Sequence, residues 1–327
     1  MKAIACTRYG PPETLELQDH AIPLPGKGEI RIEVHATTVT RADTRIRSFT
    51  FPHQWLLSLP IGLGVGFSKP RQPVLGMELA GRVESVGADV TRFKAGDEVF
   101  AATLAGLGGA YAEYACVPEN GAVALKPANI SFAQAAALPI GARTALQFLR
   151  LAKLSRGQRI LVYGASGSVG TYAVQLARHF GAQVVAVCSG ANAGLMTALG
   201  AHRVVDYNVV DFSDSGELYD VIFVTLDKCP FSSCSKALKK QGVDMNATRL
   251  LPSGAMLLAR LRGRTIFLSR SAPESPEALD YLKALVEAGE LQAVIDRAYR
   301  LEDMVEAHRY VDQGRKRGNV AISVVRQ

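Results

Sequence analysis

Residues 160–170, Ile160-Leu161-Val162-Tyr163-Gly164-Ala165-Ser166-Gly167-Ser168-Val169-Gly170, decide the fold that this sequence predicts. Residues typical of a strand lead into a cluster of small residues, and an apolar stripe of helical period follows from Val169 to Phe180. A second strand is expected at 183–188. This order is the context in which a glycine-rich turn binds the diphosphate of a dinucleotide, because free N–H groups at the helix start face the phosphate oxygens. The alternative is a tight turn in an ordinary α/β domain.

The turn itself reads Ala165-x-Gly167-x-x-Gly170, with alanine where the first glycine of the dinucleotide fingerprint stands. Gly167 allows the backbone to meet the diphosphate, and Gly170 permits close packing of the helix on the strand. No Lys-Ser/Thr pair follows the last glycine, which argues against a phosphate-transferring P-loop. We therefore expect cofactor contacts from the successive residues Ala165, Ser166, Gly167, Ser168, Val169 and Gly170.

Composition limits the class of protein. The 327 residues are 48% hydrophobic and 20% charged, which is typical of a globular chain with two domains. The net charge of +7 is scattered in short blocks without a recognition motif, so we expect no nucleic-acid partner. The most apolar run, Trp55 to Phe67, is too short to span a bilayer and is interrupted by Pro60, so we expect no stable membrane insertion. We expect a core-packed loop there, and the alternatives are an apolar loop over a binding cleft or a contact with a membrane surface.

The cysteines and the first residues indicate the compartment. Five cysteines are scattered without a CxxC pair, which favours reduced thiols. Met1 to Ile4 reads as a strand and lacks the apolar core of a signal peptide. We therefore expect a cytoplasmic protein.

The expected secondary structure changes near residue 131, from short strands to alternating helices and strands. Short strands at 2–6, 29–34 and 81–86, separated by Gly, Pro and Asp, predict a compact barrel or sandwich. After Ser131, helices at 131–138 and 142–151 precede the βα rhythm of a doubly wound parallel sheet. The strands of that sheet are expected at 159–163, 183–188, 203–206, 219–226 and 264–269, and its helices at 168–180, 191–199 and 231–240. Helices at 276–288 and 302–313 follow, and a last strand at 319–325 is expected to rejoin the N-terminal sheet.

Several motifs converge on one family by their order and spacing. They are Gly10-Pro11-Pro12-Glu13, Gly76-Met77-Glu78-Leu79-Ala80-Gly81, Phe93-Lys94-Ala95-Gly96-Asp97-Glu98-Val99, Gly109-Ala110-Tyr111-Ala112-Glu113-Tyr114, Ala135-Ala136-Ala137-Leu138-Pro139, the glycine-rich turn, and Gly200-Ala201 with Val205-Asp206-Tyr207. Over nearly its whole length the chain resembles the medium-chain dehydrogenase/reductase superfamily, in its zinc-free quinone-oxidoreductase-like branch. The resemblance implies an α/β protein: a GroES-like β-barrel catalytic domain (1–130 and 270–327) beside a Rossmann dinucleotide-binding domain (131–269), with the cofactor in the cleft between them.

Departures from the zinc-dependent relatives concern the metal ligands. Met77 stands where those relatives have a His ligand, and Thr40 aligns with their Cys ligand. The four-Cys lobe that holds a structural zinc is absent between Ala101 and Val117, and the six histidines form no HxH or HExxH pair. We therefore expect no bound metal.

The strand that ends near Cys188 informs the choice of cofactor. NAD-binding domains place an acid there, on the ribose hydroxyls, but no acid lies between Val184 and Leu195. Ser189 and Asn192 can donate hydrogen bonds to a 2′-phosphate, and the resemblance adds Tyr207 and the cluster Arg315-Lys316-Arg317. We expect NADPH (NADP) as cofactor, although many NADP-preferring relatives carry Lys or Arg where this chain has Ala191 and Asn192.

A site without a metal suits acceptors that are already electron-poor, namely quinones or α,β-unsaturated carbonyl compounds. The resemblance places Thr40 where quinone reductases often have Asn, Arg45 where many have Tyr, and Thr144 near the nicotinamide. We take Thr40 and Arg45 as candidate catalytic residues and Thr144 as a cofactor contact. Structural alternatives exist nearby: Asp43 is more simply read as a cap of the following helix, Arg45 or Arg47 binds the developing oxyanion or is solvated, and Thr144 is an ordinary residue of a helix N-terminus.

Alternatives to a quinone or enone reductase remain open. One is an NAD(P)-dependent alcohol dehydrogenase, and another is a cofactor-binding protein with little turnover, which Val224 and Asp227 favour because relatives often show Asp and Gly there. Residues 265–268 are apolar enough to pair as an edge strand in a homodimer. We expect barrel loops near 44–70 and 245–262 to shape the pocket for a small electrophile.

Overall fold

The structure is a computed structural model, and it describes residues 1–50, 62–103, 108–269 and 276–325. Most of the apolar run from Trp55 to Phe67 therefore lies outside the described residues. The chain divides into two compact units, Met1–Ile140 with Pro273–Gln327 (unit 1) and Gly141–Ala272 (unit 2). Within the described ranges, no helix has both the length and the apolar character needed to cross a membrane.

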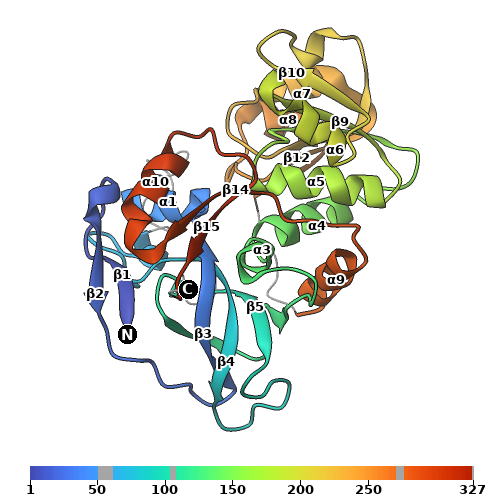
Figure 1. The fold of residues 1–327 in the computed structure, drawn as a ribbon. Coiled ribbons are helices and arrows are strands. Elements are labelled where there is room, and N and C mark those ends of the chain that lie inside the picture. Colours follow the sequence, from blue (N-terminus) through green and yellow to red (C-terminus); the bar gives the residue numbers. More distant parts are fainter. Residues whose placement is uncertain (51–61, 104–107, 270–275, 326–327) are drawn as a thin grey trace. The chain divides into compact units, whose positions relative to one another are not determined.

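Unit 2 is a doubly wound parallel sheet, as the sequence predicts (Figure 1). The strand order is β10-β9-β8-β11-β12-β13, so the chain leaves β8 toward one edge and returns to build the other half from β11. The central strands are apolar without alternation because helices cover a parallel sheet on both faces. The strands are β8 (Arg159–Tyr163), β9 (Gln183–Cys188), β10 (Arg203–Asp206), β11 (Tyr219–Val224), β12 (Leu238–Asn246) and β13 (Thr265–Leu268). The helices are α4 (Gly141–Leu151), α5 (Ser168–His179), α6 (Ala193–Ala198), α7 (Phe231–Ala237) and α8 (Gly254–Leu261).

The sequence prediction misses one strand and one helix of unit 2. The helix expected at 231–240 ends at Ala237, and β12 follows at once. β12 was hidden because its letters are LKKQGVDMN, with lysines at its start and the buried polar residues Asp244 and Asn246 inside it. The interpretation of 245–262 as barrel loops is also wrong, because that segment belongs to unit 2 and contains α8.

Unit 1 is a β structure closed by the C-terminal part of the chain. Its sheet has the order β14-β15-β3-β4-β5-β7, with β6 also paired to β3. The expectation that the last strand rejoins the N-terminal sheet is confirmed, because β15 pairs antiparallel with β3 (Ala321 opposite Thr38). The strands are β1 (Lys2–Cys6) and β2 (Leu15–Asp19), which pair with each other, and β3 (Glu29–Thr38), β4 (Glu78–Val86), β5 (Glu98–Ala102), β6 (Tyr114–Pro118), β7 (Val123–Leu125), β14 (Ile295–Arg300) and β15 (Asn319–Ser323).

Four α-helices of unit 1 bear on the site and on the boundaries: α1 (Arg41–Ser48), α3 (Phe132–Ala136), α9 (Pro276–Glu287) and α10 (Met304–Asp312). Ser131 begins α3 with a capping box in which Gln134 reaches back to the Ser131 backbone. α3 contacts β3 and β4, so residues 131–140 group with unit 1 and not with the Rossmann domain to which the sequence assigned them.

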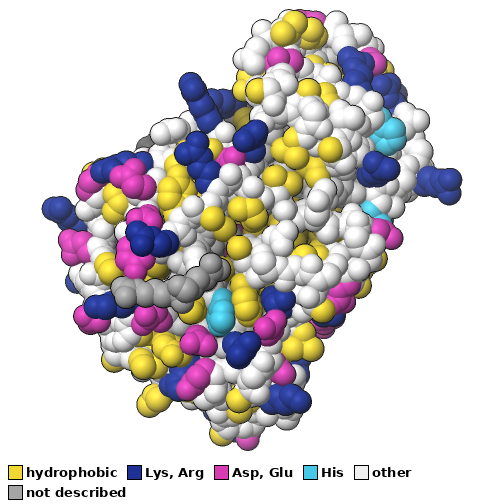
Figure 2. Space-filling model, viewed as in Figure 1, with side chains coloured by type: hydrophobic (Ala, Val, Ile, Leu, Met, Phe, Trp, Pro, Cys, Tyr) yellow, Lys and Arg dark blue, Asp and Glu magenta, His cyan; other side chains and the backbone are white. Residues whose placement is uncertain are grey.

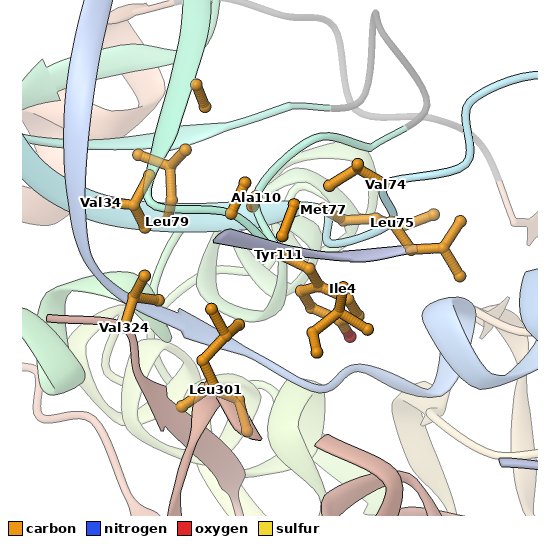
Figure 3. Close-up of a cluster of buried hydrophobic side chains, with 14 of the residues drawn as sticks. Ile4, Val34, Val74, Leu75, Met77, Leu79, Ala110, Tyr111, Leu301 and Val324 are labelled. Atoms are coloured by element: carbon orange, nitrogen blue, oxygen red, sulfur yellow. The ribbon is translucent and has the colours of Figure 1, made fainter. Parts of the chain in front are cut away.

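One large apolar cluster holds unit 1 together (Figure 3). It joins strands far apart in the sequence, because Ile4, Val34, Leu79 and Val324 all belong to it and are less than a tenth exposed. On the face drawn in Figure 2, lysine and arginine side chains are interspersed with acidic ones and form no continuous basic band on that face.

Candidate functional site

The glycine-rich turn of unit 2 joins β8 to α5 at the carboxyl edge of the parallel sheet. Gly164 has a left-handed φ of +81°, and the N–H groups of Gly164 and Ala165 donate to the carbonyl of Val187 at 3.0 and 3.1 Å. These bonds fix the turn against β9. Gly167 is the N-cap of α5 and has no side chain to cap the first-turn amides. The amides of the first turn of α5, which include those of Val169 and Gly170, precede the first intrahelical hydrogen bond, from the Thr171 N–H to the Gly167 carbonyl, and suit an anion.

Gly167 and Gly170 are glycines for different reasons. A Cβ on Gly170 would lie 2.3 Å from the Gly164 carbonyl oxygen and 2.7 Å from Ala165 backbone atoms, so only glycine lets α5 approach the turn. A Cβ on Gly167 would meet nothing closer than that same oxygen at 3.5 Å. The space beside Gly167 is therefore open, and a bound group such as a diphosphate could approach the backbone there. The turn fits a diphosphate on this observation.

Ser189 and Asn192, the two donors expected beside β9, lie together. Asn192 Nδ2 donates to Ser189 Oγ at 3.0 Å, and the Asn192 N–H donates to the Ser189 carbonyl at 2.9 Å. Tyr207 follows β10, is 52% exposed, and donates its backbone N–H to the Cys188 carbonyl. Parallel pairing of β9 with β10 therefore brings all three to one end of the sheet.

The same arrangement reveals an acid that the sequence window missed. Asp206 ends β10 opposite Cys188, and a Cβ on Gly190 would lie 2.5 Å from its Oδ2. Hydrogen bonds from the Asn208 backbone, the Asn208 side chain and the Gly190 N–H lower the pKa of Asp206, so its carboxylate is charged. Asp206 is visible in the sequence as the last residue of the strand that pairs with β9, but a search for an acid along β9 alone does not include it.

Thr144 and the basic cluster at 315–317 fall in different units. Thr144 is the fourth residue of α4 in unit 2 and is half-buried. The cluster belongs to unit 1, where Arg317 pairs with Asp296 and Lys316 Nζ donates to the Gly318 carbonyl at 2.6 Å.

In unit 1, Thr40 is the N-cap of α1. Its Oγ1 accepts from the Asp43 N–H at 3.2 Å, while Asp43 Oδ2 accepts from the Thr40 N–H at 2.9 Å. The hydroxyl and that carboxylate oxygen are also hydrogen-bonded to each other at 2.5 Å. Asp43 therefore contributes to capping, as the alternative reading expects, but as the third helical residue of a capping box whose N-cap is Thr40.

Buried titratable groups surround this cap. Burial raises the pKa of Asp43 to about 6, against hydrogen bonds from Thr40, the Gly76 N–H and Tyr111. Burial likewise raises the pKa of Glu78 to about 7, although Glu78 accepts from the Thr38 hydroxyl and from the Ile140 N–H. Tyr111 bonds His308 Nε2 through its hydroxyl at 3.2 Å. Burial, with a smaller contribution from a nearby arginine, lowers the pKa of His308 to about 3, so that imidazole is neutral.

The two arginines of α1 differ. Arg45 is half-buried. Arg47 is 2% exposed, and its Nη2 donates to Asp312 Oδ2 at 2.6 Å, so the expectation that it is solvated is wrong. The salt bridge joins α1 to the end of α10, which the sequence spacing of 265 residues does not predict.

Thr40 and Met77, which stand where zinc-dependent relatives have their ligands, belong to neighbouring parts of unit 1. Asp43, three residues after Thr40, accepts from the Gly76 N–H, which adjoins Met77. Met77 is 6% exposed and packs in the apolar cluster with Ala110 and Tyr111 (Figure 3). Over the described ranges, no three His, Cys, Asp or Glu side chains are grouped so that they could hold a metal ion.

Comparisons with known proteins agree with both units. The alcohol dehydrogenase GroES-like domain family matches residues 26–127, and the zinc-binding dehydrogenase family matches residues 199–322. A quinone oxidoreductase of Sus scrofa is 34% identical, with 94% of this chain and 93% of that protein covered. A 2-methylene-furan-3-one reductase of Solanum lycopersicum is 32% identical, with 98% and 79% covered. The solved quinone oxidoreductase of Coxiella burnetii superposes with a TM-score of 0.88 at 28% identity, covering 99% of both chains.

A glycine turn on a doubly wound sheet, joined to a GroES-like unit, defines an oxidoreductase that uses a nicotinamide dinucleotide. The chain belongs to the medium-chain dehydrogenase/reductase superfamily, in its quinone-oxidoreductase-like branch.

Proposed function

We propose that the protein is a zinc-independent NADPH-dependent reductase that transfers hydride to a quinone or an α,β-unsaturated carbonyl compound. The observation that carries the proposal is the open turn at Gly167, placed where the strand order reverses at β8, which is the position for a dinucleotide in such sheets. Relatives named quinone oxidoreductase and 2-methylene-furan-3-one reductase, each at least 30% identical, support the two acceptor classes.

Residues of unit 2 would hold the cofactor. The amides of Ser168, Val169 and Gly170 would bind the diphosphate, and Ser189 and Asn192 would donate to a 2′-phosphate. Tyr207 and Thr144 are further proposed contacts. When bound, the reduced nicotinamide supplies the hydride. Asp206 opposes the 2′-phosphate electrostatically, because three hydrogen bonds stabilise its charged carboxylate.

In unit 1, the Thr40 hydroxyl and Arg45 are proposed to stabilise the oxygen that gains charge when an electron-poor acceptor is reduced. The protonation state of Asp43 in the capping box decides whether the Thr40 hydroxyl can donate to the substrate. An ionised Asp43 takes the Thr40 hydroxyl proton as a hydrogen bond, whereas a protonated Asp43 donates to the Thr40 oxygen and releases that proton for the substrate. Asp43 thus acts as a positioning residue through Thr40.

Zinc independence is proposed on the residue types at positions 40 and 77. A threonine hydroxyl and a methionine packed in the core are poor replacements for the Cys and His ligands of zinc enzymes. Without such a Lewis acid a plain alcohol or ketone lacks activation, so the site favours acceptors that are already polarised.

The test is turnover by the purified protein with NADPH and NADH against quinones, enones and simple alcohols, with elemental analysis of the same sample. We expect oxidation of NADPH by quinones or enones and no stoichiometric metal. Thr40→Ala and Arg45→Ala should each reduce kcat about tenfold or more. Alcohol oxidation that depends on a bound metal would establish the alcohol dehydrogenase instead. Tight NADPH binding without turnover of any acceptor would establish a cofactor-binding protein.

A homodimer and a reducing compartment complete the proposal. β13 pairs only with β12 among the described strands, and the neighbouring helix α8 exposes Leu257, Leu258 and Leu261 by 48%, 48% and 86%. Sedimentation of the wild type against Phe267→Lys tests pairing through this edge, and a monomeric wild type would refute it.

All five cysteines are unpaired thiols, which suits the cytoplasm.

A further inference from the structure

Two buried thiols of unit 2 lie close together, and the function proposed above uses neither. Cys229 precedes α7 and Cys234 lies inside it, and their Sγ atoms are 3.3 Å apart. Their residues are 4% and 2% exposed. A disulfide bond is about 2.0 Å long, so the two sulfurs need to approach each other by little more than about 1 Å to form one.

A buried carboxylate adjoins the pair. Asp244, on β12, is hydrogen-bonded to the Cys234 thiol and is 2% exposed. Its Oδ2 has no hydrogen-bond partner among the residues that the structure describes. Burial raises the pKa of Asp244 to about 6, and Arg249 is the charged group that opposes this shift. At neutral pH most of the Asp244 carboxylate is ionised and can accept the Cys234 proton.

The segment before the thiols holds the dinucleotide turn. Thr225 follows β11, and its Oγ1 is within 3.0 Å of both the Tyr163 and the Gly164 carbonyl oxygens. Leu226 lies so near that a Cβ on Gly164 would be 2.5 Å from its Cδ2. The Tyr163 ring packs against the apolar cluster that contains both cysteines. Cys229 thus lies four residues after Thr225, in the segment that contacts the first residues of the turn.

We propose that Cys229 and Cys234 form a redox-sensitive site that a hydroperoxide converts to a disulfide, and that the disulfide form binds the dinucleotide more weakly. The Cys229 thiol reduces the peroxide to an alcohol, or to water for hydrogen peroxide, and becomes a sulfenic acid. The Cys234 sulfur then attacks the Cys229 sulfur. Its proton passes through Asp244 to the leaving oxygen, which departs as water. Two thiols lose two hydrogen atoms in total, and one O–O bond is reduced.

Burial makes this a slow sensor and not a scavenger. The hydrogen bond to Cys229, burial and the neighbouring Asp244 all raise the pKa of Cys234, so little thiolate exists at rest and the proton has to leave for Asp244 as the sulfur attacks. Asp244→Asn keeps the shape of the side chain but removes the proton acceptor. We expect it to slow disulfide formation about tenfold while the thermal midpoint stays near that of the wild type. An unchanged rate would remove Asp244 from the mechanism.

The chemical test treats the purified full chain with hydrogen peroxide and maps its peptides without reduction. We expect a Cys229–Cys234 disulfide that dithiothreitol reverses. Cys116→Ser is the matched control, because Cys116 is half-buried on β6 of unit 1 and should leave the reaction unchanged. Cys229→Ala and Cys234→Ala should abolish it. Free thiols at 229 and 234 after Cys116 has been oxidised would overturn the proposal.

The functional test compares NADPH titrations of the oxidised and reduced protein, and this arm rests on the proposed function. We expect about tenfold weaker binding after oxidation, present in Cys116→Ser and absent in Cys234→Ala. Complete disulfide formation with unchanged affinity would overturn the coupling to the turn. Failure of the reduced protein to bind NADPH would instead refute the proposed cofactor, and the peptide map would still decide the thiol chemistry.

Discussion

The dinucleotide turn of unit 2 and the α1 cap of unit 1 depend on different kinds of residue, the first on glycines and the second on buried ionisable side chains. Residues 164–170 carry no ionisable side chain, and their geometry is set by glycines and backbone hydrogen bonds. Thr40 and Asp43 form their cap among buried ionisable groups. The turn should therefore respond to changes of shape and hardly to pH, whereas the cap should respond to pH. Four predictions test this contrast, in order of decreasing effect.

The largest effect is expected from His308 in acid. Its pKa is about 3 in the folded protein, below the ordinary value of 6.5, so the stability it contributes is lost as pH falls from about 6.5 toward 3. His308→Gln keeps a donor for Tyr111 but does not titrate. Between about pH 7 and pH 4 the wild type should lose about 3 kcal/mol relative to this variant. Urea unfolding of both at several pH values measures the difference, and parallel curves would contradict the assignment.

The glycine pair of the turn should separate stability from binding. Gly170→Ala places a methyl group against backbone atoms that cannot move aside, and should cost about 1–3 kcal/mol of stability. Gly167→Ala has room and an extended backbone, so its stability should change by no more than about 0.5 kcal/mol. The same variant should weaken NADPH binding about tenfold. Thermal melting and NADPH titration of both variants measure these effects. Equal stabilities for the two would show that shape does not control the turn.

Asp43 should make turnover depend on pH through Thr40. Its pKa is about 6, and only the protonated form releases the Thr40 hydroxyl proton, so kcat should fall by up to about tenfold as pH rises through 6. In Asp43→Asn the amide donates to the Thr40 oxygen at every pH, so the fall in kcat near pH 6 should be absent. The measurement is kcat against pH for both proteins. Gly76, Tyr111 and Glu78 also face Asp43 and are unchanged in this comparison.

The smallest effect concerns the choice of cofactor. Asp206→Asn removes the charge beside Gly190 and should raise the preference for NADPH over NADH a few-fold, about 1 kcal/mol. Asn192→Asp adds a charge at the end of β9 and should lower that preference by a similar amount. Titrations with both dinucleotides decide the matter. Opposite changes are required, and a shift in the same direction would exclude a 2′-phosphate near these residues.

The sequence predicts best where a pattern is local. The strands at 159–163, 183–188 and 203–206 have the predicted bounds because the apolar residues of each are consecutive and a turn follows. Ser131 and Gln134, three positions apart, form the capping box at the start of α3. The glycine turn was predictable for the same reason, since every residue of it lies within one short stretch.

Features that depend on distant contacts were not predictable. β12 is placed inside the sheet by pairing with β11 and β13, whereas its polar sequence LKKQGVDMN resembles a surface segment. The Arg47–Asp312 pair and the Tyr111–His308 pair join residues 265 and 197 positions apart. Asp206 approaches Gly190 only because β10 pairs with β9. In each case the sequence shows which side chains are present, but it does not show which distant segments pair and bring them together.

The return of β15 to β3 has a consequence for synthesis on the ribosome. Residues 36–38 of β3 have an antiparallel partner at 321–323, so the edge of the strand that faces β15 stays unpaired until nearly the whole chain has been translated, although Ala36 and Thr37 already pair with β4 on the other edge. Unit 2 is continuous in sequence and can complete its sheet while the first half of unit 1 still waits. An exposed strand edge that persists so long is a target for chaperones and for aggregation, and faster translation of the C-terminal part of unit 1 would shorten that interval.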